Sequence, residues 1–498
     1  MIRGARALLP ALSIICAACG GGATPVVVSS APTTSSIQRL QQHLNAFARL
    51  HDLRRGTWGI VVRSLDRQET VYTLNADTLL MPASAMKVVT LATAATRLGW
   101  TYSYETRLLG IGAVDSGILG GDLLVVGSGD PSIDDWDGAA TRLFQTWAAR
   151  LKSAGVRTID GRIVGDDNQF EDEALGPGWA WDDLGASFAT GAGALQFNQN
   201  AARARITPGQ AVSDPAIVEL SPSYSGLSVR NQLTTVGAGE ALAIDLRRAP
   251  ESAVVAFRGS VPAGSAPFFR NVAVDNPTLY FVTALRDVLI ANGIEVRGPA
   301  VDIDLIADPP GRADGAPLVS HLSPPLSALA ATMMKLSQNL YAETLMKTMG
   351  DGDVRGLASG RAAARAVLDE WGIEPLDVLL TDGSGLSRYN LISAKALSIV
   401  LGQVAADATL AVPFEASLPI AGQDGTLEGR MKGTRAEGNA HAKTGSFSNA
   451  RSLAGYVRTA DGERLAFVIM ANNFATPPDV VERTMDAMVV RLAEFTRR

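Results

Sequence analysis

The sequence predicts a mixed α/β fold of the α+β kind, in which an antiparallel sheet packs against helices and a large, mostly β insertion interrupts the domain. Apolar residues with helical spacing occur before residue 100 and again after residue 320. Between residues 101 and 315 the chain instead has short β-like runs separated by Gly, Asp and Pro. We therefore expect residues 37–100 and 316–498 to form one domain, with residues 101–315 inserted as one or more β-rich domains.

Composition supports a folded protein and excludes some partners. Of the 498 residues, 47% are hydrophobic and 19% are charged, which is enough apolar material for a sizeable core. The formal net charge is −6 and no long basic run occurs, so nucleic acid and anionic membrane surfaces are poor candidates for partners. Only seven of the 44 basic residues are lysine, so a lysine within a motif carries more weight.

Residues 1–19 are predicted to be an export signal. Arg3 and Arg6 precede a short apolar run of about 12 residues, which is too short to cross a bilayer. Cys19 lies just before a run of glycines, as at the lipidation site of a bacterial lipoprotein, and a signal peptide that is cleaved without lipidation is the alternative. A lipid on Cys19 would anchor the protein at a membrane surface without a spanning helix. Cys16 is the only other cysteine, so no disulfide is expected in the folded body.

The elements that follow the signal alternate between helix and strand. Residues 20–36 are rich in Gly, Ser, Thr and Pro and are predicted to be a flexible linker. A helix is expected next, from apolar residues at Ile37, Leu40, Leu44, Phe47 and Leu50. Residues 57–77 alternate around a turn at 66–68 and predict a β-hairpin. A buried helix then runs from about Met86 to Leu98 and ends at Gly99.

Helices return after residue 320 and strands follow them. The segments 326–350 and 360–372 have helical patterns, and residues 441–474 predict consecutive antiparallel strands. A last helix is expected near 478–495, with one apolar face formed by Val481, Met485, Met488, Leu492 and Phe495. Its polar face holds as many acids as bases, so we expect it to pack on the sheet, a membrane-surface helix being the alternative.

Ser84 and Lys87 stand out in the otherwise apolar helix before residue 100. Positions i and i+3 of a helix are neighbours on one face. A lysine in apolar surroundings loses hydration, which lowers its pKa, and a neutral amine could take the proton of the Ser84 hydroxyl and make it a nucleophile. Ser84 would lie near the helix N-terminus, where free backbone N–H groups favour negative charge. A helix cap followed by a snorkelling lysine is the structural alternative.

Ser337 and Asn339 form a second motif, in a predicted turn between two helices. A hydroxyl here could relay a proton to a leaving amine. A carboxamide could hold a peptide backbone by hydrogen bonds. Helix capping is the alternative explanation for this pair.

A third motif, Lys443, Thr444 and Gly445, begins a strand-like run. A lysine and a hydroxyl there can bind a carboxylate, and Gly445 would let a substrate backbone lie close to the strand. The backbone N–H of Ser446 could face an oxyanion together with the N–H of Ser84. A surface turn is the alternative.

The three motifs, in this order, match the set found in penicillin-binding proteins and class A β-lactamases. The chain resembles the S13 peptidase family, the low-molecular-mass class C penicillin-binding proteins with D-alanyl-D-alanine carboxypeptidase and endopeptidase activity. Ser84 and Ser337 are 253 residues apart, and the S13 family is similar in having a large β-rich insertion at this place. Four further segments resemble that family: "VVGSGDPSID", "GPGWAWDDL", "TDGSGLSRYNLIS" and "SLPIAGQDGTLEGRMKGT".

This resemblance implies a penicillin-binding/β-lactamase-like transpeptidase fold. It also implies that Ser84 is the acylated nucleophile, Lys87 the general base and Ser337 part of a proton relay. Substrate-binding residues implied by the same resemblance are Asn339, Lys443, Thr444, Gly445 and Ser446. The expected partners are peptidoglycan stem peptides, with β-lactam antibiotics as covalent inhibitors, and no metal or organic cofactor is required. The expected location is the cell envelope or periplasm, after export.

Other polar residues receive weaker assignments. Glu343, one turn after Asn339, is expected to be a surface or helix-pairing residue, and Asp130 a turn former. Asp382 and Ser384 are expected to organise a loop beside the site. The four histidines lack zinc-binding spacing and no serine lies in a Gly-x-Ser-x-Gly elbow, which disfavours a zinc peptidase and an α/β-hydrolase.

Two other functions are compatible with the same fold. A β-lactamase would need a dedicated base for deacylation, and no convincing candidate is found in the sequence. A non-catalytic protein that senses peptidoglycan or β-lactams would not need the intact serine and lysine pair. The sequence leaves open whether carboxypeptidase or endopeptidase action dominates.

Overall fold

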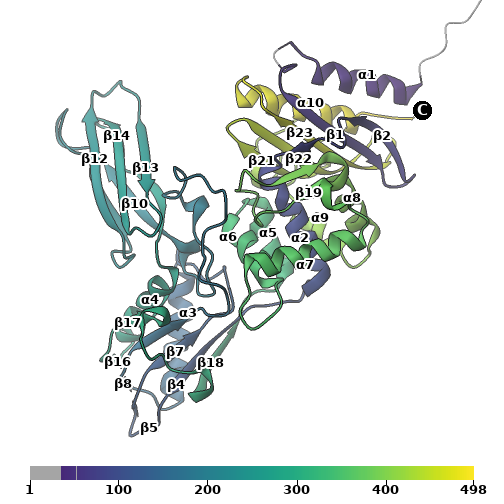
Figure 1. The fold of residues 1–498 in the computed structure, drawn as a ribbon. Coiled ribbons are helices and arrows are strands. Elements are labelled where there is room, and N and C mark those ends of the chain that lie inside the picture. The colour runs from purple at the N-terminus through teal and green to yellow at the C-terminus, as the bar shows by residue number, and fades with distance from the viewer. Residues whose placement is uncertain (1–34, 52, 498) are drawn as a thin grey trace, which may run out of the picture.

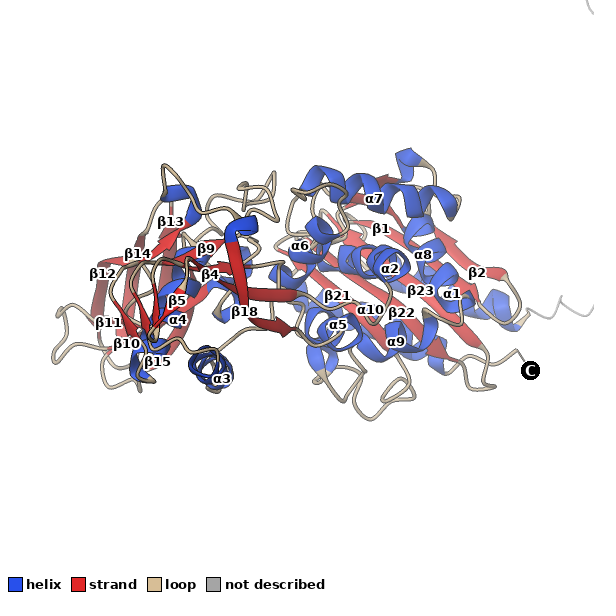
Figure 2. Ribbon diagram, turned by 90° about the horizontal axis from the view of Figure 1, so that it is seen from below, coloured by secondary structure: helices blue, strands red, loops and turns tan. Residues whose placement is uncertain are grey.

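The computed structural model describes residues 35–51 and 53–497. The first and last parts of the described chain come together in one domain, which we call the sheet domain, and the middle of the sequence lies beside it as the insertion (Figure 1, Figure 2). The predicted export signal with Cys19, and the linker as far as residue 34, lie outside the described residues. None of the described helices is both long and apolar enough to cross a membrane.

The sheet domain is built on a five-stranded antiparallel sheet of order β2-β1-β23-β22-β21. Its strands are β1 Thr57–Ser64, β2 Glu69–Leu74, β21 His441–Phe447, β22 Ala450–Arg458 and β23 Arg464–Asn472. The N-terminal hairpin therefore pairs with the three C-terminal strands through β1 and β23, and both the hairpin and the consecutive strands predicted from the sequence are confirmed. The alternation of side chains along these strands gives the sheet two apolar faces.

Helices cover both faces of this sheet. On one face lie α1 Ser36–Ala48 and α10 Pro478–Ala493, whose buried residues share a core with Ile60, Leu453 and Phe467. The apolar face predicted for α10 is buried, so the helix packs on the sheet as expected. Leu50, expected to continue the apolar face of the first helix, is instead exposed because α1 ends at Ala48.

The other face carries the helix that holds Lys87 and directly follows Ser84. This helix, α2 Met86–Leu98, is buried from Met86 to Ala95 because it is surrounded by helices from the second half of the chain. Those helices are α5 Leu326–Lys335, α6 Asn339–Thr348, α7 Leu357–Glu370 and α8 Ala394–Ala406, and α9 Ala411–Ser417 packs against α5 and α8. A short sheet of β3 Leu79–Leu80, β20 Leu391–Ser393 and β19 Val378–Leu379 lies beside them.

The insertion has two parts. The first is a five-stranded sheet of order β17-β9-β7-β4-β18, with β4 Glu105–Ile111, β7 Leu123–Val126, β9 Ile163–Asp166, β17 Ala300–Asp302 and β18 Gly315–Leu322. Because β18 pairs with β4, this sheet continues past the predicted boundary at residue 315. A small sheet extends it: β16 Glu295–Val296, β8 Thr158–Ile159, β6 Ile118–Leu119 and β5 Val114–Asp115.

The second part of the insertion is a pair of three-stranded sheets that share a small core. One sheet has the order β11-β10-β15, with β10 Ala201–Thr207, β11 Ile217–Ser221 and β15 Phe268–Ala273. The other has the order β12-β14-β13, with β12 Ser228–Val236, β13 Ala243–Arg248 and β14 Val254–Pro262.

Two long helices in the insertion were not expected from the sequence: α3 Ala139–Ser153 and α4 Pro277–Ala291. Both pack in the core of the first part, with Phe144, Trp147 and Phe281 in contact through their rings. The segment of α4 is apolar on most sides and rich in β-branched and aromatic residues, so it resembles a buried strand more than an amphipathic helix.

Candidate active site

Ser84 lies in a short 3₁₀ turn, η1 Ala83–Ala85, immediately before α2. Ala83 has a φ of 46°, a left-handed conformation that is unusual for a residue other than glycine. The carbonyl of the preceding Pro82 accepts a hydrogen bond from the Ser452 hydroxyl of β22 at 2.6 Å. This bond ties the turn to the sheet, so the strained backbone that presents Ser84 is held by the surrounding structure.

Gly445 on β21 lies directly against this turn. A Cβ atom at position 445 would overlap the carbonyl oxygen of Pro82 and the hydroxyl of Ser452, and it would lie 2.9 Å from the Ala85 nitrogen. From the sequence, Gly445 is predicted to let a substrate backbone lie close to the strand. In the structure the close neighbour is the protein's own turn, and the glycine is what lets Ser84 lie next to the strand.

The Lys87 side chain is fully buried and contacts three parts of the chain. Its Nζ lies 3.0 Å from Ser84 Oγ, 2.6 Å from Asn339 Oδ1 and 2.8 Å from the Ser384 carbonyl oxygen. Burial lowers the pKa of Lys87 to about 7, an effect that the nearby carboxylates of Glu343 and Asp382 partly oppose. The amine therefore titrates near neutral pH, and in its neutral form it can accept the proton of the Ser84 hydroxyl.

Ser337 and Lys443 form a second hydroxyl–amine pair. Ser337 lies between α5 and α6 with a φ of 58°, and its Oγ accepts a hydrogen bond from Lys443 Nζ at 2.9 Å. Lys443 also donates to the carbonyl oxygen of Thr444 at 2.8 Å. Burial lowers the pKa of Lys443 well below its usual value, and repulsion from Lys87 lowers it further.

Asn339, the first residue of α6, joins this site to the insertion. Its Oδ1 accepts from Lys87, and its Nδ2 donates to the carbonyl oxygen of Phe188 at 2.7 Å. Phe188 belongs to η2 Ser187–Ala189, a short turn within the insertion. The insertion therefore supplies part of the wall of the site.

These elements enclose a cleft of about 440 Å³. Its lining residues come from both the sheet domain and the insertion: Ala83, Ser84, Asp183, Phe188, Ser337, Asn339, Gly385, Leu386, Arg388, Ser446, Phe447, Ser448 and Arg451. Ser84, Ser337, Asn339 and Ser446 open into the cleft, while Lys87 and Lys443 lie buried behind it. Phe447, which lies just after the third motif, lines the cleft and packs under the Arg388 guanidinium at 5.0 Å.

The structure thus brings together all the residues of the three sequence motifs. Hydrogen bonds connect Ser84, Lys87 and Asn339, and a separate bond connects Ser337 and Lys443. Thr444 is nearly buried, and its hydroxyl donates to the Thr426 hydroxyl at 2.8 Å. This arrangement allows the Ser84 hydroxyl, just before the start of α2, to transfer its proton to Lys87. The second hydroxyl–amine pair, Ser337 and Lys443, lies beside it.

Glu343 is a functional-site residue that the sequence assignment placed wrongly. It is 4% exposed, not on the surface, and its carboxylate accepts hydrogen bonds from the backbone N–H groups of Gly383 at 3.1 Å and Ser384 at 2.7 Å. Burial raises the pKa of Glu343, and the nearby Asp382 adds to this effect. Because Ser384 offers its carbonyl to Lys87, Glu343 positions one of the three partners of that amine.

Lys347 lies one turn further along α6 and holds a loop of the insertion. It is 3% exposed, and its Nζ donates to the carbonyl oxygens of Glu173 at 2.8 Å, Ala192 at 3.1 Å and Glu171 at 3.3 Å. Asn339, Glu343 and Lys347 are spaced four residues apart, so they share one face of α6. That spacing is the signal by which the sequence could have grouped them.

Asp382 organises the loop after β19, as the sequence predicts. Its carboxylate accepts from the backbone N–H groups of Gly385 and Ser387, from Asn390 Nδ2 and from Trp179 Nε1, at distances of 2.6–2.9 Å. The turn-forming role of Asp130 is also confirmed, since it accepts from the N–H and hydroxyl of Ser132.

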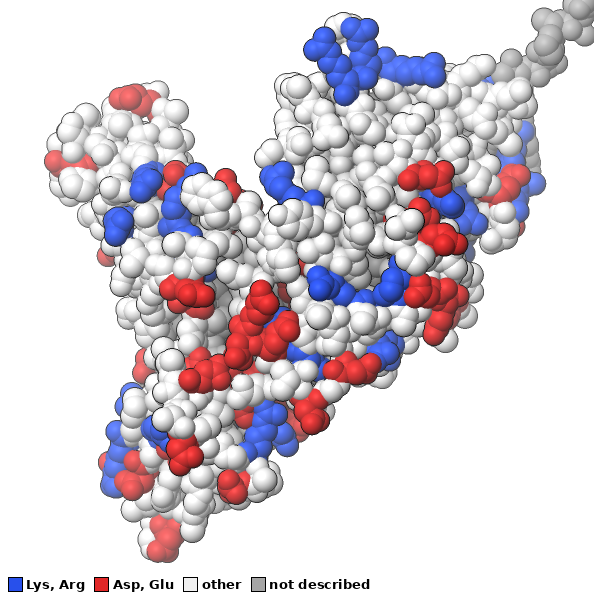
Figure 3. Space-filling view, viewed as in Figure 1, with Lys and Arg blue, Asp and Glu red and all other residues white. Residues whose placement is uncertain are grey.

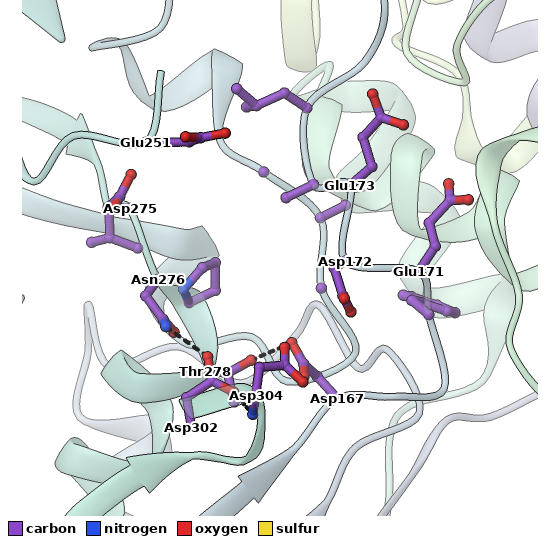
Figure 4. A pocket seen from close by; sticks show the side chains of 18 of the residues that line it. Asp167, Glu171, Asp172, Glu173, Glu251, Asp275, Asn276, Thr278, Asp302 and Asp304 are labelled. Carbon is purple, nitrogen blue, oxygen red and sulfur yellow. Dashed lines mark hydrogen bonds between the residues drawn. The ribbon is translucent and has the colours of Figure 1, made fainter. Parts of the chain in front are cut away.

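A separate acidic cavity of about 520 Å³ lies in the insertion (Figure 4). Within the described ranges, the carboxylates of Asp167, Asp302 and Asp304 are the group whose oxygens lie close enough together to hold a metal ion, within 4.8 Å of one another. Thr278 donates to Asp167, and Asn276 donates to Asp302 at 2.6 Å. No lining residue is shared with the serine cleft, so this cavity is not part of that site.

Comparison with known proteins relates nearly the whole described chain to one family. Residues 40–495 match the D-Ala-D-Ala carboxypeptidase 3 (S13) family. The chain is 32% identical over 488 residues to a D-alanyl-D-alanine carboxypeptidase from an Actinomadura species, an alignment that covers 95% of this chain and 88% of that protein. It is 30% identical over 440 residues to the D-alanyl-D-alanine carboxypeptidase DacB of Haemophilus influenzae, covering 87% of this chain and 88% of that protein.

Solved structures agree with this relationship. The crystal structure of penicillin binding protein 4 (dacB) from Haemophilus influenzae matches with a TM-score of 0.79 and 27% identity, covering 91% of this chain and 99% of that chain. The same protein complexed with a β-lactam matches with a TM-score of 0.73 and 26% identity, covering 89% and 98%. The predicted family and the penicillin-binding type of fold are therefore confirmed.

We expect the substitution Glu343→Gln to lower the free energy of unfolding by about 1–3 kcal/mol. Glutamine offers one carbonyl oxygen to two buried N–H groups, so one of them loses its acceptor. Urea unfolding followed by tryptophan fluorescence measures the loss. Glu370→Gln at the exposed end of α7 is the matched control and should change stability by less than about 0.5 kcal/mol. Equal effects of the two substitutions would contradict the positioning role of Glu343.

We expect the substitution Gly445→Ala to destabilise the protein by about 1–3 kcal/mol, because the new methyl group overlaps the turn that carries Ser84. Thermal unfolding and a crystal structure of the variant would show the loss of stability and the shift of residues 82–85. Gly239→Ala is the control, since a Cβ there meets no atom within 4 Å. An unshifted turn in a fully stable Gly445→Ala variant would disprove the steric explanation.

Proposed function

The chain belongs to the D-Ala-D-Ala carboxypeptidase 3 (S13) family, and we propose that it is a serine D,D-peptidase that acts on peptidoglycan through an acyl-enzyme on Ser84. The proposed substrates are stem peptides that end in D-Ala-D-Ala and cross-bridges with an equivalent D,D bond. Its relatives from Actinomadura and Haemophilus influenzae carry the name D-alanyl-D-alanine carboxypeptidase. Cleavage of cross-bridges is the endopeptidase form of the same chemistry.

One observation carries this proposal: a buried amine with a depressed pKa lies 3.0 Å from a serine hydroxyl that opens into a cleft. A serine hydroxyl is a weak nucleophile unless a base takes its proton. Lys87 is close enough to do so, and its pKa near neutrality makes the neutral amine available at physiological pH.

In the first step, Ser84 Oγ attacks the carbonyl carbon of the penultimate D-alanine while its proton passes to Lys87. A tetrahedral intermediate forms, and its oxyanion is proposed to lie against the backbone N–H groups of Ser84 and Ser446. The position of Ser84 at the start of a helix supports this, because the helix N-terminus favours negative charge.

In the second step, the C–N bond breaks and the leaving amine must gain a proton. Ser337 is the proposed relay, since its hydroxyl lies in the cleft and is hydrogen-bonded to Lys443. It gives its proton to the leaving nitrogen and takes up the proton that Lys87 received from Ser84, so Lys87 is neutral again. D-alanine or the bridging peptide then leaves, and Ser84 remains as an ester. Water hydrolyses that ester, with Lys87 taking the proton of the attacking water and returning it to Ser84.

Lys443 and Thr444 are proposed to face the terminal carboxylate of the substrate, and Asn339 to hold its peptide backbone. Burial leaves Lys443 with a lowered pKa in the free protein. A carboxylate bound nearby favours the charged form of an amine, so substrate binding would raise the pKa of Lys443. The site would then gain an ion pair only when the correct terminus is present.

β-Lactams are proposed to acylate Ser84 because their strained amide and carboxylate occupy the places of the scissile bond and the terminal carboxylate. A β-lactamase on this fold is the alternative, and it needs a base that deacylates quickly. Among the described residues that line the cleft, Asp183 is the single carboxylate. Burial and the neighbouring Asp182 raise its pKa, while Arg388 and Arg247 oppose that shift. No hydrogen bond within the described residues joins Asp183 to Ser84 or Lys87, so it is not placed to activate a water there. Long-lived acylation is therefore the expected behaviour.

The proposed place of action is the cell envelope, since peptidoglycan lies outside the cytoplasmic membrane. Residues 1–19 are proposed to direct export, and Cys19 to carry a lipid anchor. Mass spectrometry of the mature protein purified from membranes would test both assignments.

We expect Ser84→Ala to abolish covalent labelling by a fluorescent penicillin and to reduce release of D-alanine from a D-Ala-D-Ala peptide by at least about 10⁴-fold. The wild-type protein should show both activities, with label that persists on a gel. Ser153→Ala on the exposed side of α3 is the control and should leave both unchanged. D-alanine release that survives Ser84→Ala would disprove the acyl-enzyme mechanism, and rapid loss of label from the wild type would favour a β-lactamase.

The rate of acylation by penicillin should rise with pH, with a midpoint near pH 7. Below the pKa of Lys87 the amine is charged and cannot accept a proton, and above it the neutral amine is present. Stopped-flow measurement of acylation from pH 5.5 to 8.5 gives the profile. Lys87→Arg should remove acylation at every pH, because arginine stays charged, while Lys395→Arg on the surface should keep the profile. A flat profile in the wild type would rule out Lys87 as the base.

A further inference from the structure

A second groove of about 690 Å³ lies on the insertion, next to the active-site cleft. It is lined by Ala186, Ser187, Arg203, Leu246, Phe269, Arg270 and Asn271. The turn η2 separates the two spaces, because Ser187 lines the groove while Phe188 lines the cleft. The groove and the cleft therefore lie on either side of one short turn.

Exposed aromatic side chains gather around these two spaces. In the part of the chain that the structure describes, four aromatic residues are exposed, each at 45–69% of its surface: Trp181, Phe188, Phe269 and Tyr389. Phe188 lines the cleft and Phe269 the groove. Trp181 lies in the segment that leads to η2, and Tyr389 follows the cleft residue Arg388. Exposed aromatic rings at one place are typical of binding surfaces.

The arginines of the groove are available to a ligand. The Arg203 guanidinium lies between two rings, 4.7 Å from the centroid of Trp136 and 5.6 Å from that of Phe269. No described carboxylate lies within ion-pair distance of Arg203 or Arg270, and Arg270 donates to the backbone carbonyl oxygen of Phe269 at 3.0 Å. Stacking holds the plane of Arg203 while leaving the N–H groups along its edge free.

Nearby arginines, unlike Arg203 and Arg270, form ion pairs with carboxylates. Arg205, two residues along β10, pairs with Glu219 at 3.3 Å, and Arg247 pairs with Asp245 at 2.8 Å. Both arginines that line the groove thus lack an acidic partner among the described residues, whereas these two neighbours are paired. A preorganised guanidinium is suited to a carboxylate, which it binds through two parallel hydrogen bonds.

We propose that this groove binds a carboxylate-bearing segment of the peptidoglycan peptide, beyond the bond held in the active-site cleft. The proposal rests on the proposed function and adds to it a binding surface for the part of a longer or cross-linked peptide that lies outside the cleft. The protein as a whole is acidic, with a net charge of −6, so an anionic ligand requires local positive charge. Basic side chains lie on both sides of the notch between the insertion and the sheet domain (Figure 3).

The test compares a long and a short substrate in the full-length protein. We expect Arg203→Gln/Arg270→Gln to lower the ratio of kcat/KM for a D,D-cross-linked muropeptide to kcat/KM for a short D-Ala-D-Ala peptide by about tenfold, since two charge-assisted contacts are lost. Phe269→Ala should lower the same ratio by removing one of the rings that orient Arg203. Arg230→Gln, an exposed arginine on β12 in the other sheet, is the matched control and should keep the wild-type ratio.

A binding assay separates this proposal from the proposed function. In the Ser84→Ala background, the protein should co-sediment with insoluble peptidoglycan, and the double substitution should weaken this binding about tenfold. Binding that depends on Arg203 and Arg270 supports the groove even if no D-alanine is released by the wild type. Equal ratios and equal sedimentation of the double variant and the Arg230→Gln control would overturn the groove while leaving the peptidase intact.

Discussion

The buried amine of Lys87 is the interaction on which the rest of the site depends. Its partners, the Ser84 hydroxyl, the Asn339 amide and the Ser384 carbonyl, come from three distant parts of the chain. No carboxylate within the described residues reaches ion-pair distance of it, so burial is opposed only by hydrogen bonds and by more distant acids. Withdrawing any partner would leave a buried polar group unpaired, at a cost of about 1–3 kcal/mol. Burial of the amine in the assembled site therefore keeps its pKa low enough for it to act as a base, and the hydrogen bonds hold it beside Ser84.

Polar side chains on one face of helix α6 hold Lys87 and the surrounding loops in place. Asn339, Glu343 and Lys347 lie on one buried face, and each holds a different segment: the amine of Lys87, the loop that contains Ser384, and the loop of the insertion from Glu171 to Ala192. Buried polar groups are costly when they are only partly satisfied, and here each has partners. A shift of α6 would therefore disturb Lys87, the Ser384 loop and the insertion loop together. The position of this one helix thus determines the geometry of the whole cleft wall.

Local patterns could be predicted from the sequence, and contacts between distant segments could not. Ser84 and Lys87 are close because a helix places positions i and i+3 together, and the strands from His441 to Asn472 follow from their alternation. Glu343 can be buried because the N–H groups of Gly383 and Ser384 bind its carboxylate. These groups lie about 40 residues later in the chain, so no spacing within α6 reveals them. Gly445 was expected to make room for a substrate, yet the atom it accommodates is the Pro82 carbonyl oxygen, a neighbour that exists only after the strand and the turn have met. The helix α4 was missed because it is buried on most sides and so lacks a polar face, whereas α3 has an amphipathic pattern that the β-rich assignment of residues 101–315 overlooked.

The insertion takes part in the site and does more than extend the fold. Its Phe188 carbonyl binds Asn339, its Trp179 indole binds Asp382, and its backbone carbonyls accept from Lys347. These bonds fix η2 at the rim of the cleft, so the sheet beyond η2 is held at a constant place relative to Ser84. The Arg203 guanidinium stacks on aromatic rings, and no described carboxylate neutralises its charge. Its placement beside a fixed rim is therefore better explained by what it can bind than by what it stabilises, which links the architecture of the insertion to the length of substrate that the enzyme can hold.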